Sequence, residues 1–142
     1  MVDREVFDRR LSRLESLLRD LGALGASDLR AFRADRGQQA QAERWTHLAV
    51  ECCLDLANHL IAERGWPAPD SYRAAFRTLA QEGQIDPDLA EHMAGWAGLR
   101  NILVHLYLDI DHDRLHAALA NELEQLTSFA SAMQRVLDED AT

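Results

Sequence analysis

The sequence predicts an all-α fold, a helical bundle of about five helices in one domain over residues 1–142. Three observations support this prediction. Apolar residues recur at intervals of three and four along most of the chain, which is the periodicity of helices with one buried face. No stretch alternates between apolar and polar residues as a half-buried strand does. The three prolines and seven glycines are scattered, so no long linker divides the chain.

The first helix is predicted to end near Gly22 and Gly25. Its buried face consists of apolar residues at alternating intervals of four and three, namely Phe7, Leu11, Leu14, Leu18 and Leu21. Ser27 then caps a short helical turn that carries Leu29 and Phe32, because a serine hydroxyl accepts a hydrogen bond from a free amide at a helix start.

A long helix is predicted to begin after Asp35, which forms a capping box with Gln38. Gly65 ends this helix, and the prolines in residues 66–69 make the following connector extended. The inner face of the long helix is expected to comprise Trp45, Leu48, Ala49, Cys52, Leu56 and Leu60.

Three more helix starts and stops follow. Asp70 or Ser71 caps a helix that ends at Gly83, with an expected buried face of Tyr72, Ala75, Phe76 and Leu79. Asp86-Pro87 begins the next helix, because proline fits the first helical position. The apolar residues of that helix are Leu89, Met93, Trp96, Leu99, Leu103 and Val104. One continuous final helix begins after the cap residue Asp111 and carries Leu115, Leu119, Leu126, Phe129, Met133 and Leu137.

The composition excludes several classes of protein. With 47% apolar and 27% charged residues, the chain resembles soluble globular proteins, and no apolar run approaches the ~20 residues of a transmembrane helix. Asp3 and Glu5 predict that the first residues are not a secretory signal. The adjacent cysteines Cys52 and Cys53 cannot form an ordinary disulfide, which predicts a reducing, cytoplasmic location. A net charge of −9 excludes non-specific coating of nucleic acid.

One segment, R-N-I-L-V-H-L-Y at residues 100–107, brings together Arg100, His105 and Tyr107. Arginine binds phosphate through two hydrogen bonds, histidine transfers protons near neutral pH, and the tyrosine hydroxyl is open to modification. On an ideal helix Arg100 and Tyr107 lie nearly in line, whereas Arg100 and His105 diverge by about 140°. Arg100 and His105 therefore converge only if the helix ends or distorts between them, or if a symmetry mate supplies the second group.

This stretch resembles the signature of the HepT family, the HEPN-domain toxins paired with minimal nucleotidyltransferase (MNT) antitoxins. Its motif R-x4-H-x-Y is matched by Arg100, His105 and Tyr107. Three further segments resemble family features in the family's order, namely residues 54–61, 69–72 and 79–83. The similarity thus covers nearly the whole chain. Leu106 departs from the pattern, because an acidic residue is common there, and this departure makes the local surface more apolar.

The resemblance implies a homodimer of HEPN-like domains that acts as a metal-independent endoribonuclease, the toxin of a type VII HepT/MntA toxin–antitoxin pair. His105 would exchange a proton with the ribose 2′-hydroxyl or the leaving 5′-oxygen, and Arg100 would stabilise charge on the phosphate. Asn101 would support either group. The resemblance implies an RNA substrate, with no cofactor, metal or membrane.

The resemblance also implies that the cognate MNT antitoxin transfers AMP from ATP onto Tyr107. The added phosphate would repel RNA and block the cleft. Asp55, Asn58 and His59 belong to the family-like run of residues 54–61, and we interpret them as cleft or dimer contacts.

Two interpretations without catalysis stand beside this one. In the first, the chain is a nucleotidyltransferase-binding subunit that presents substrate to its partner, with Arg100 and His105 as interface or nucleotide contacts. In the second, the motif only packs the seam of a helical dimer. RNA cleavage by the purified chain distinguishes the nuclease from both.

Two other polar patterns are interpreted without metal binding or catalysis. His112 and His116 imitate the two histidines of a zinc motif, but their place at a helix start predicts solvated first-turn residues. His47, Glu51 and Asp55 follow one another at four-residue intervals on the long helix. A solvated polar face is the prediction for these three residues, and a role in the dimer cleft or in nucleotide binding is the alternative.

Overall fold

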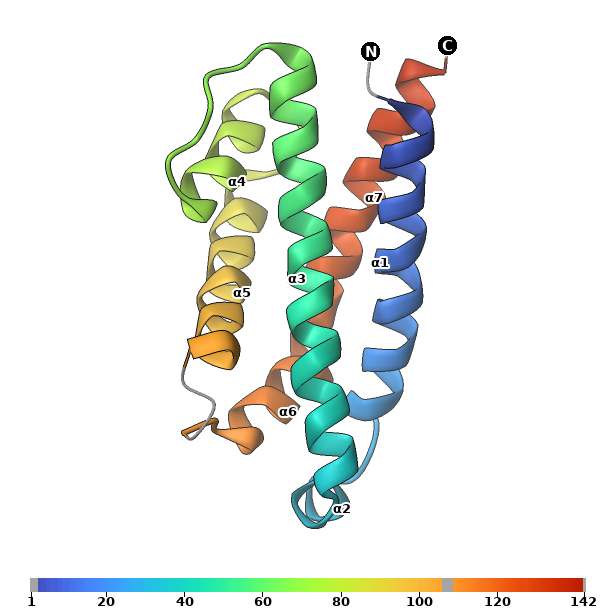
Figure 1. Ribbon diagram of the computed structural model, residues 1–142, viewed down its shortest axis with the longest axis vertical. Coiled ribbons are helices and arrows are strands. Elements are labelled where there is room, and N and C mark those ends of the chain that lie inside the picture. Colours follow the sequence, from blue (N-terminus) through green and yellow to red (C-terminus); the bar gives the residue numbers. More distant parts are fainter. Residues whose placement is uncertain (1–2, 106–108, 142) are drawn as a thin grey trace.

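The computed structural model describes residues 3–105 and 109–141, which fold into an all-α bundle (Figure 1). These residues form seven helices and no strand, so the predicted fold class is confirmed and the expected number of about five helices is too low. In chain order the helices are α1 (Arg4–Gly25), α2 (Leu29–Ala34), α3 (Arg36–Arg64), α4 (Tyr72–Gln81), α5 (Pro87–His105), α6 (His112–Asn121) and α7 (Leu123–Asp140).

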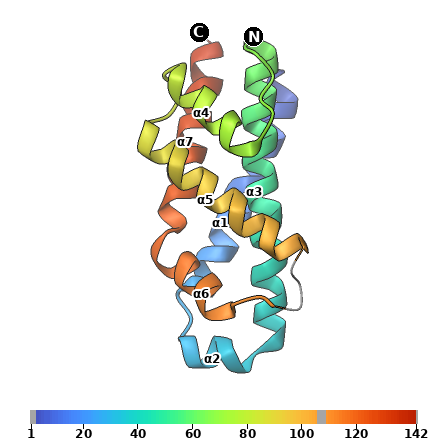
Figure 2. The same ribbon diagram turned by 90° about the vertical axis from the view of Figure 1, so that its left-hand side faces the viewer.

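The long helix α3 lies between two layers. On one side α1 and α7 run along it, and on the other side lies the pair formed by α4 and α5, with α2 and α6 at one end of the bundle (Figures 1 and 2). The start of α1 is tied to the end of α7, because Arg4 Nη1 donates to the Leu137 carbonyl at 2.6 Å. Arg64 joins the end of α3 to Asp140 at 2.9 Å.

The buried face of α1 is the one that the apolar spacing predicts. All five expected residues of its face are buried against α3, α6 and α7. Four fully buried phenylalanines, Phe7, Phe32, Phe76 and Phe129, lie in the same core. The rings of Phe76 and Phe129 meet edge to face at 5.6 Å between centroids and so connect α4 to α7.

Most of the predicted helix starts are confirmed by hydrogen bonds. The side chains of Asp35, Ser71 and Asp111 accept bonds from the backbone amides three residues onward, as N-caps do. The prediction for α2 is wrong by one residue, because Asp28 is its N-cap. The Ser27 hydroxyl instead donates to the Leu24 carbonyl at 2.6 Å, within the last turn of α1.

The buried face of α3 differs from the predicted one. Ala49, Leu56 and Leu60 are buried as expected, but Trp45, Leu48 and Cys52 are only half-buried. Fully buried residues that the prediction omitted include Thr46, Val50 and Cys53. Because α3 is covered from two sides, its buried surface is wider than one stripe and its centre is displaced. Burial raises the pKa values of both thiols, which fits inert cysteines.

The predicted final helix is two helices. The chain leaves helical geometry at Glu122, where φ is −123° and ψ is 0°, so α6 and α7 run in different directions. The break lets α6 pack against α1 and α2 while α7 follows α1 along its length. All the expected apolar residues are buried, and their spacing stays in phase across Glu122, so periodicity alone misses the break.

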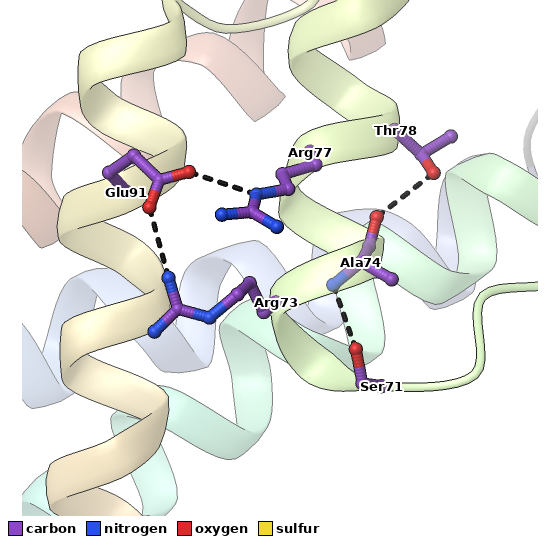
Figure 3. A network of polar contacts seen from close by, with 6 residues as sticks. All are labelled: Ser71, Arg73, Ala74, Arg77, Thr78 and Glu91. Atoms are coloured by element: carbon purple, nitrogen blue, oxygen red, sulfur yellow. Dashed lines mark hydrogen bonds and ion pairs between the residues drawn. The ribbon is translucent and has the colours of Figure 1, made fainter.

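Two arginines of α4 hold it against α5. Arg73 Nη1 and Arg77 Nε each donate to the Glu91 carboxylate at 3.0 Å, and these bonds lower the pKa of Glu91 (Figure 3). At the start of the same helix, the Ser71 hydroxyl oxygen accepts a hydrogen bond from the Ala74 amide at 3.0 Å and so caps the first turn. Tyr72 was expected in the core but is 38% exposed, because the buried side of α4 is taken by Ala75, Phe76 and Leu79.

His116 is a structural residue. The expectation of solvated histidines is wrong for it, because its side chain is buried, its Nε2 donates to the Ser27 carbonyl at 2.8 Å, and its ring lies 5.1 Å from that of Phe32. His112 points instead to Glu43, at 2.9 Å. Within residues 3–105 and 109–141, no three metal-ligating side chains are clustered, and no helix is long and apolar enough to span a bilayer.

Replacing His116 with alanine is expected to lower the free energy of unfolding by about 2 kcal/mol, from the lost hydrogen bond and the lost ring packing. Urea denaturation followed by circular dichroism measures this change. His92→Ala is the matched control, because His92 is exposed on α5 and its loss is expected to change stability by less than about 0.5 kcal/mol. Equal effects of the two substitutions would show that the buried bond contributes nothing.

Candidate functional site

The last turns of α5 present the residues of the sequence motif. Arg100 and Asn101 are half-buried, and His105, the last residue of the helix, is exposed. Two hydrophobic side chains of the same turns, Ile102 and Val104, are 41% and 37% exposed. Val104, one of the apolar residues that the sequence gives this helix, therefore lies at the surface. Tyr107 lies outside the described residues.

Arg100 is held by groups from three helices. Its Nη2 forms an ion pair with the Glu51 carboxylate of α3, and its Nη1 donates to Asn101 Oδ1 at 2.9 Å. The guanidinium carbon lies 5.3 Å from the ring centre of Tyr72 at the start of α4, which is cation–π distance. The side chain is 15% exposed, and Nε is buried without a hydrogen-bond partner among the described residues.

A second imidazole lies beside this pair. His47 Nε2 is 3.8 Å from Glu51 Oε1, and Arg44 Nη1 is 3.4 Å from His47 Nδ1. Burial lowers the pKa of His47, the positive charges of Arg100 and Arg44 lower it further, and Glu51 opposes them. The neutral imidazole is therefore favoured at pH 7. We call these residues the Arg100 cluster, comprising Arg44, His47, Glu51, Tyr72 and Arg100.

The sequence places His47 and Glu51 on one face of the long helix but does not predict that this face meets Arg100. The prediction of a solvated face on α3 is wrong for His47 and Glu51, which are half-buried and lie against Arg100. A half-buried arginine favours an acidic partner, which is one available signal beside the spacing of His47 and Glu51. It does not say which of the 24 acidic residues is the partner.

The structure does not bring Arg100 and His105 together within one chain. Helix α5 is continuous from Pro87 to His105, so no break or distortion cancels their divergence of about 140°. His105 makes no hydrogen bond or ion pair with the described residues. A groove of about 460 Å³ beside this end of α5 is lined by Gly98, Ile102 and Arg114 among others, but by neither motif residue.

Two of the three residues of the family-like run on α3 contact α1. Asp55 Oδ2 is 3.8 Å from Arg10 Nε of α1, and burial raises the pKa of Asp55. The His59 ring packs edge to face on Phe7 of α1, with 5.7 Å between centroids. Asn58 is exposed. Asp55 and His59 therefore contact α1, and the role of all three residues in a cleft stays a prediction.

The helical bundle, with Arg-x4-His at the end of α5, resembles the fold of a solved HEPN toxin. In the solved structure of a Shewanella oneidensis HEPN toxin, tri-AMPylated and in complex with an MNT antitoxin, the toxin fold matches with a TM-score of 0.85. The match covers 95% of this chain and 99% of that chain at 24% identity. This likeness shows a shared fold.

The chain belongs to the family described as Ribonuclease HepT-like, whose model matches residues 8–133. The mRNA nuclease HepT of Shewanella oneidensis is 32% identical over 84 residues, which are 59% of this chain and 63% of that protein. The tRNA nuclease HepT of Aphanizomenon flos-aquae is 32% identical over 88 residues, 62% of this chain and 60% of that protein. The matched stretch thus spans less than two thirds of either relative.

Proposed function

We propose that this chain is the toxin of a HepT/MntA toxin–antitoxin pair of type VII and that it cleaves RNA without a metal ion. The family match over residues 8–133 supports this proposal, as do the two relatives named as RNA nucleases. The observation that carries the proposal lies at the end of α5. There Arg100, held in a polar cluster, and the exposed His105 stand five residues apart, which is the spacing of the family motif. We place the activity in the cytoplasm, where RNA and ATP are found.

The chemistry is transesterification. The ribose 2′-oxygen attacks phosphorus, a 2′-O–P bond forms as the P–O5′ bond breaks, and the products carry a 2′,3′-cyclic phosphate and a 5′-hydroxyl. His105 transfers a proton to or from the reacting oxygens. Arg100 stabilises the charge on the phosphate, and Asn101 keeps its guanidinium oriented through the bond at 2.9 Å. Neither role requires a metal or a cofactor.

A second copy of the chain is part of the proposed site. Among the described residues, three large hydrophobic side chains have more than a third of their surface exposed, namely Tyr72, Ile102 and Val104. All three lie on α4 and α5 beside Arg100 or within five residues of it in sequence. Exposed apolar residues around a functional motif favour an interface. A two-fold axis there would place His105 of one copy near Arg100 of the other.

The partner in the proposal is an MNT nucleotidyltransferase antitoxin that uses ATP to AMPylate Tyr107. The AMP phosphate would add negative charge beside the motif and repel the RNA backbone. The Shewanella oneidensis HEPN toxin, solved in tri-AMPylated form with an MNT antitoxin, supports this part of the proposal.

The test is cleavage of RNA by the purified chain in EDTA. We expect cleavage that persists in EDTA, leaves 2′,3′-cyclic phosphate ends and falls steeply as salt rises, because cations of the protein must displace counterions from phosphate. Gel analysis of end-labelled RNA over a salt series measures all three. An intact RNA at every protein and salt concentration would refute the nuclease and favour the non-catalytic nucleotidyltransferase-binding subunit.

A further inference from the structure

Within one chain, the imidazole beside Arg100 is that of His47. Both side chains contact the same carboxylate, because Glu51 pairs with the guanidinium and lies 3.8 Å from His47 Nε2. The His47 side chain is 25% exposed, so a substrate that reaches Arg100 also reaches this ring. His105 lies on another side of α5.

The contacts of His47 determine where its proton lies. Arginine has no acceptor, so in the contact of 3.4 Å the Arg44 guanidinium donates and His47 Nδ1 accepts. The ring hydrogen is then on Nε2, which faces the Glu51 carboxylate. The ring is thus a neutral base whose lone pair on Nδ1 is covered only by an exposed arginine. An RNA phosphate that binds Arg44 would uncover that lone pair.

We propose that His47 is a second proton-transfer residue of the nuclease site, the group that accepts the 2′-hydroxyl proton while His105 donates a proton to the leaving 5′-oxygen. This inference rests on the proposed ribonuclease function. The step balances, because one proton leaves the 2′-oxygen for His47 Nδ1 and one passes from His105 to O5′. Two histidines supply the base and the acid that transesterification needs, and the neutral ring of His47 is the base.

The charges around His47 suit a base. Arg44 and Glu51 face it from α3, and Arg100 faces it from α5. The two arginines attract the phosphate, and burial together with their charges lowers the His47 pKa, so the ring is unprotonated before the reaction. Once it has accepted the proton, the Glu51 carboxylate stabilises the imidazolium.

The experiment compares His47→Gln with wild type in single-turnover cleavage of RNA across pH. We expect the rate to fall by about 100-fold with little change in KM. In wild type the rate should rise with pH through the His47 pKa, which lies below the ordinary value of 6.5, because only the neutral ring accepts a proton. That rising limb should vanish in His47→Gln. Free imidazole should restore part of the cleavage to His47→Ala, because it supplies the missing base.

Two controls separate catalysis from folding. His92→Gln makes the same change at an exposed histidine of α5 and should leave rate and pH profile unchanged. In the wild-type chain, NMR of the His47 ring should show a shifted titration when an RNA analogue with a 2′-deoxyribose at the cleavage site binds. This second measurement tests the proposal even if the His47 variants fail to fold, because it uses the wild-type chain.

The outcomes are distinguishable. If wild type cleaves RNA and His47→Gln keeps both its rate and its rising limb, this inference is overturned and the proposed function stands. A slower His47→Gln with an unchanged pH profile, or no change in the His47 titration on binding, also overturns proton transfer by His47. If wild type does not cleave RNA at all, the proposed function and this inference fall together.

Discussion

A chain with His105→Ala is expected to fold normally and to lose RNA cleavage by about 100- to 10,000-fold, the range that one proton-transfer group contributes. His105 is the exposed last residue of α5, and it makes no hydrogen bond or ion pair with the described residues. Its removal should therefore cost less than about 0.5 kcal/mol of stability. Cleavage rates and thermal melts of the two proteins measure both statements.

The same substitution has a readout in cells. Expression of the wild-type chain without its antitoxin should arrest growth, and His105→Ala should relieve the arrest. His92→Ala should not, because His92 is an exposed histidine of the same helix outside the motif. A His105→Ala chain that stays fully toxic would remove His105 from catalysis.

Local signals were sufficient for the helices whose surroundings are simple. The face of α1 follows from its spacing alone, because its inner side packs on the rest of the bundle. Asp35, Ser71 and Asp111 were identified as caps because a cap is a bond to the backbone three residues away. Capping bonds and helical periodicity depend on a few consecutive residues, so they can be predicted from the local sequence.

Features that depend on distant contacts were not predictable. The break at Glu122 leaves the apolar spacing in phase, so only the position of α1 and α2 explains why α6 turns away. Tyr72 is exposed because the side of α4 that packs on the bundle is formed by Ala75, Phe76 and Leu79. The sequence predicts a buried Tyr72, because an aromatic residue at helical spacing is usually buried.

The candidate site divides in the same way. The sequence itself draws attention to Arg100 and His105, the family resemblance gives them roles, and helix geometry gives their divergence. The ion pair of Arg100 with Glu51 joins α5 to α3 and has no local signature. The proximity of His47 to Arg100 follows from that pair, so the second imidazole became visible only in the folded chain.

Helices α1 and α6 pack closely at Gly25, and Gly25→Ala is expected to lower the free energy of unfolding by about 3 kcal/mol. Gly25 is the buried last residue of α1. A methyl group added there would lie 2.6 Å from the carbonyl carbon and oxygen of Leu119 in α6 and 2.9 Å from the Ala120 nitrogen. These are backbone atoms, so no side chain can rotate away and α6 itself must shift.

Gly95→Ala is the matched control for this prediction. Gly95 is also helical, but nothing lies within 4 Å of a methyl group added there. Because alanine is about 1 kcal/mol more favourable than glycine inside a helix, this control should be more stable than wild type. Urea midpoints of the three proteins give the comparison. If Gly25→Ala gains stability as Gly95→Ala does, α1 and α6 do not meet as closely as the structure places them. If Gly25→Ala loses stability, the absence of a side chain at Gly25 is what allows α6 to cross the end of α1. Helix α6 lies there below the end of α5, the helix that carries Arg100 and His105.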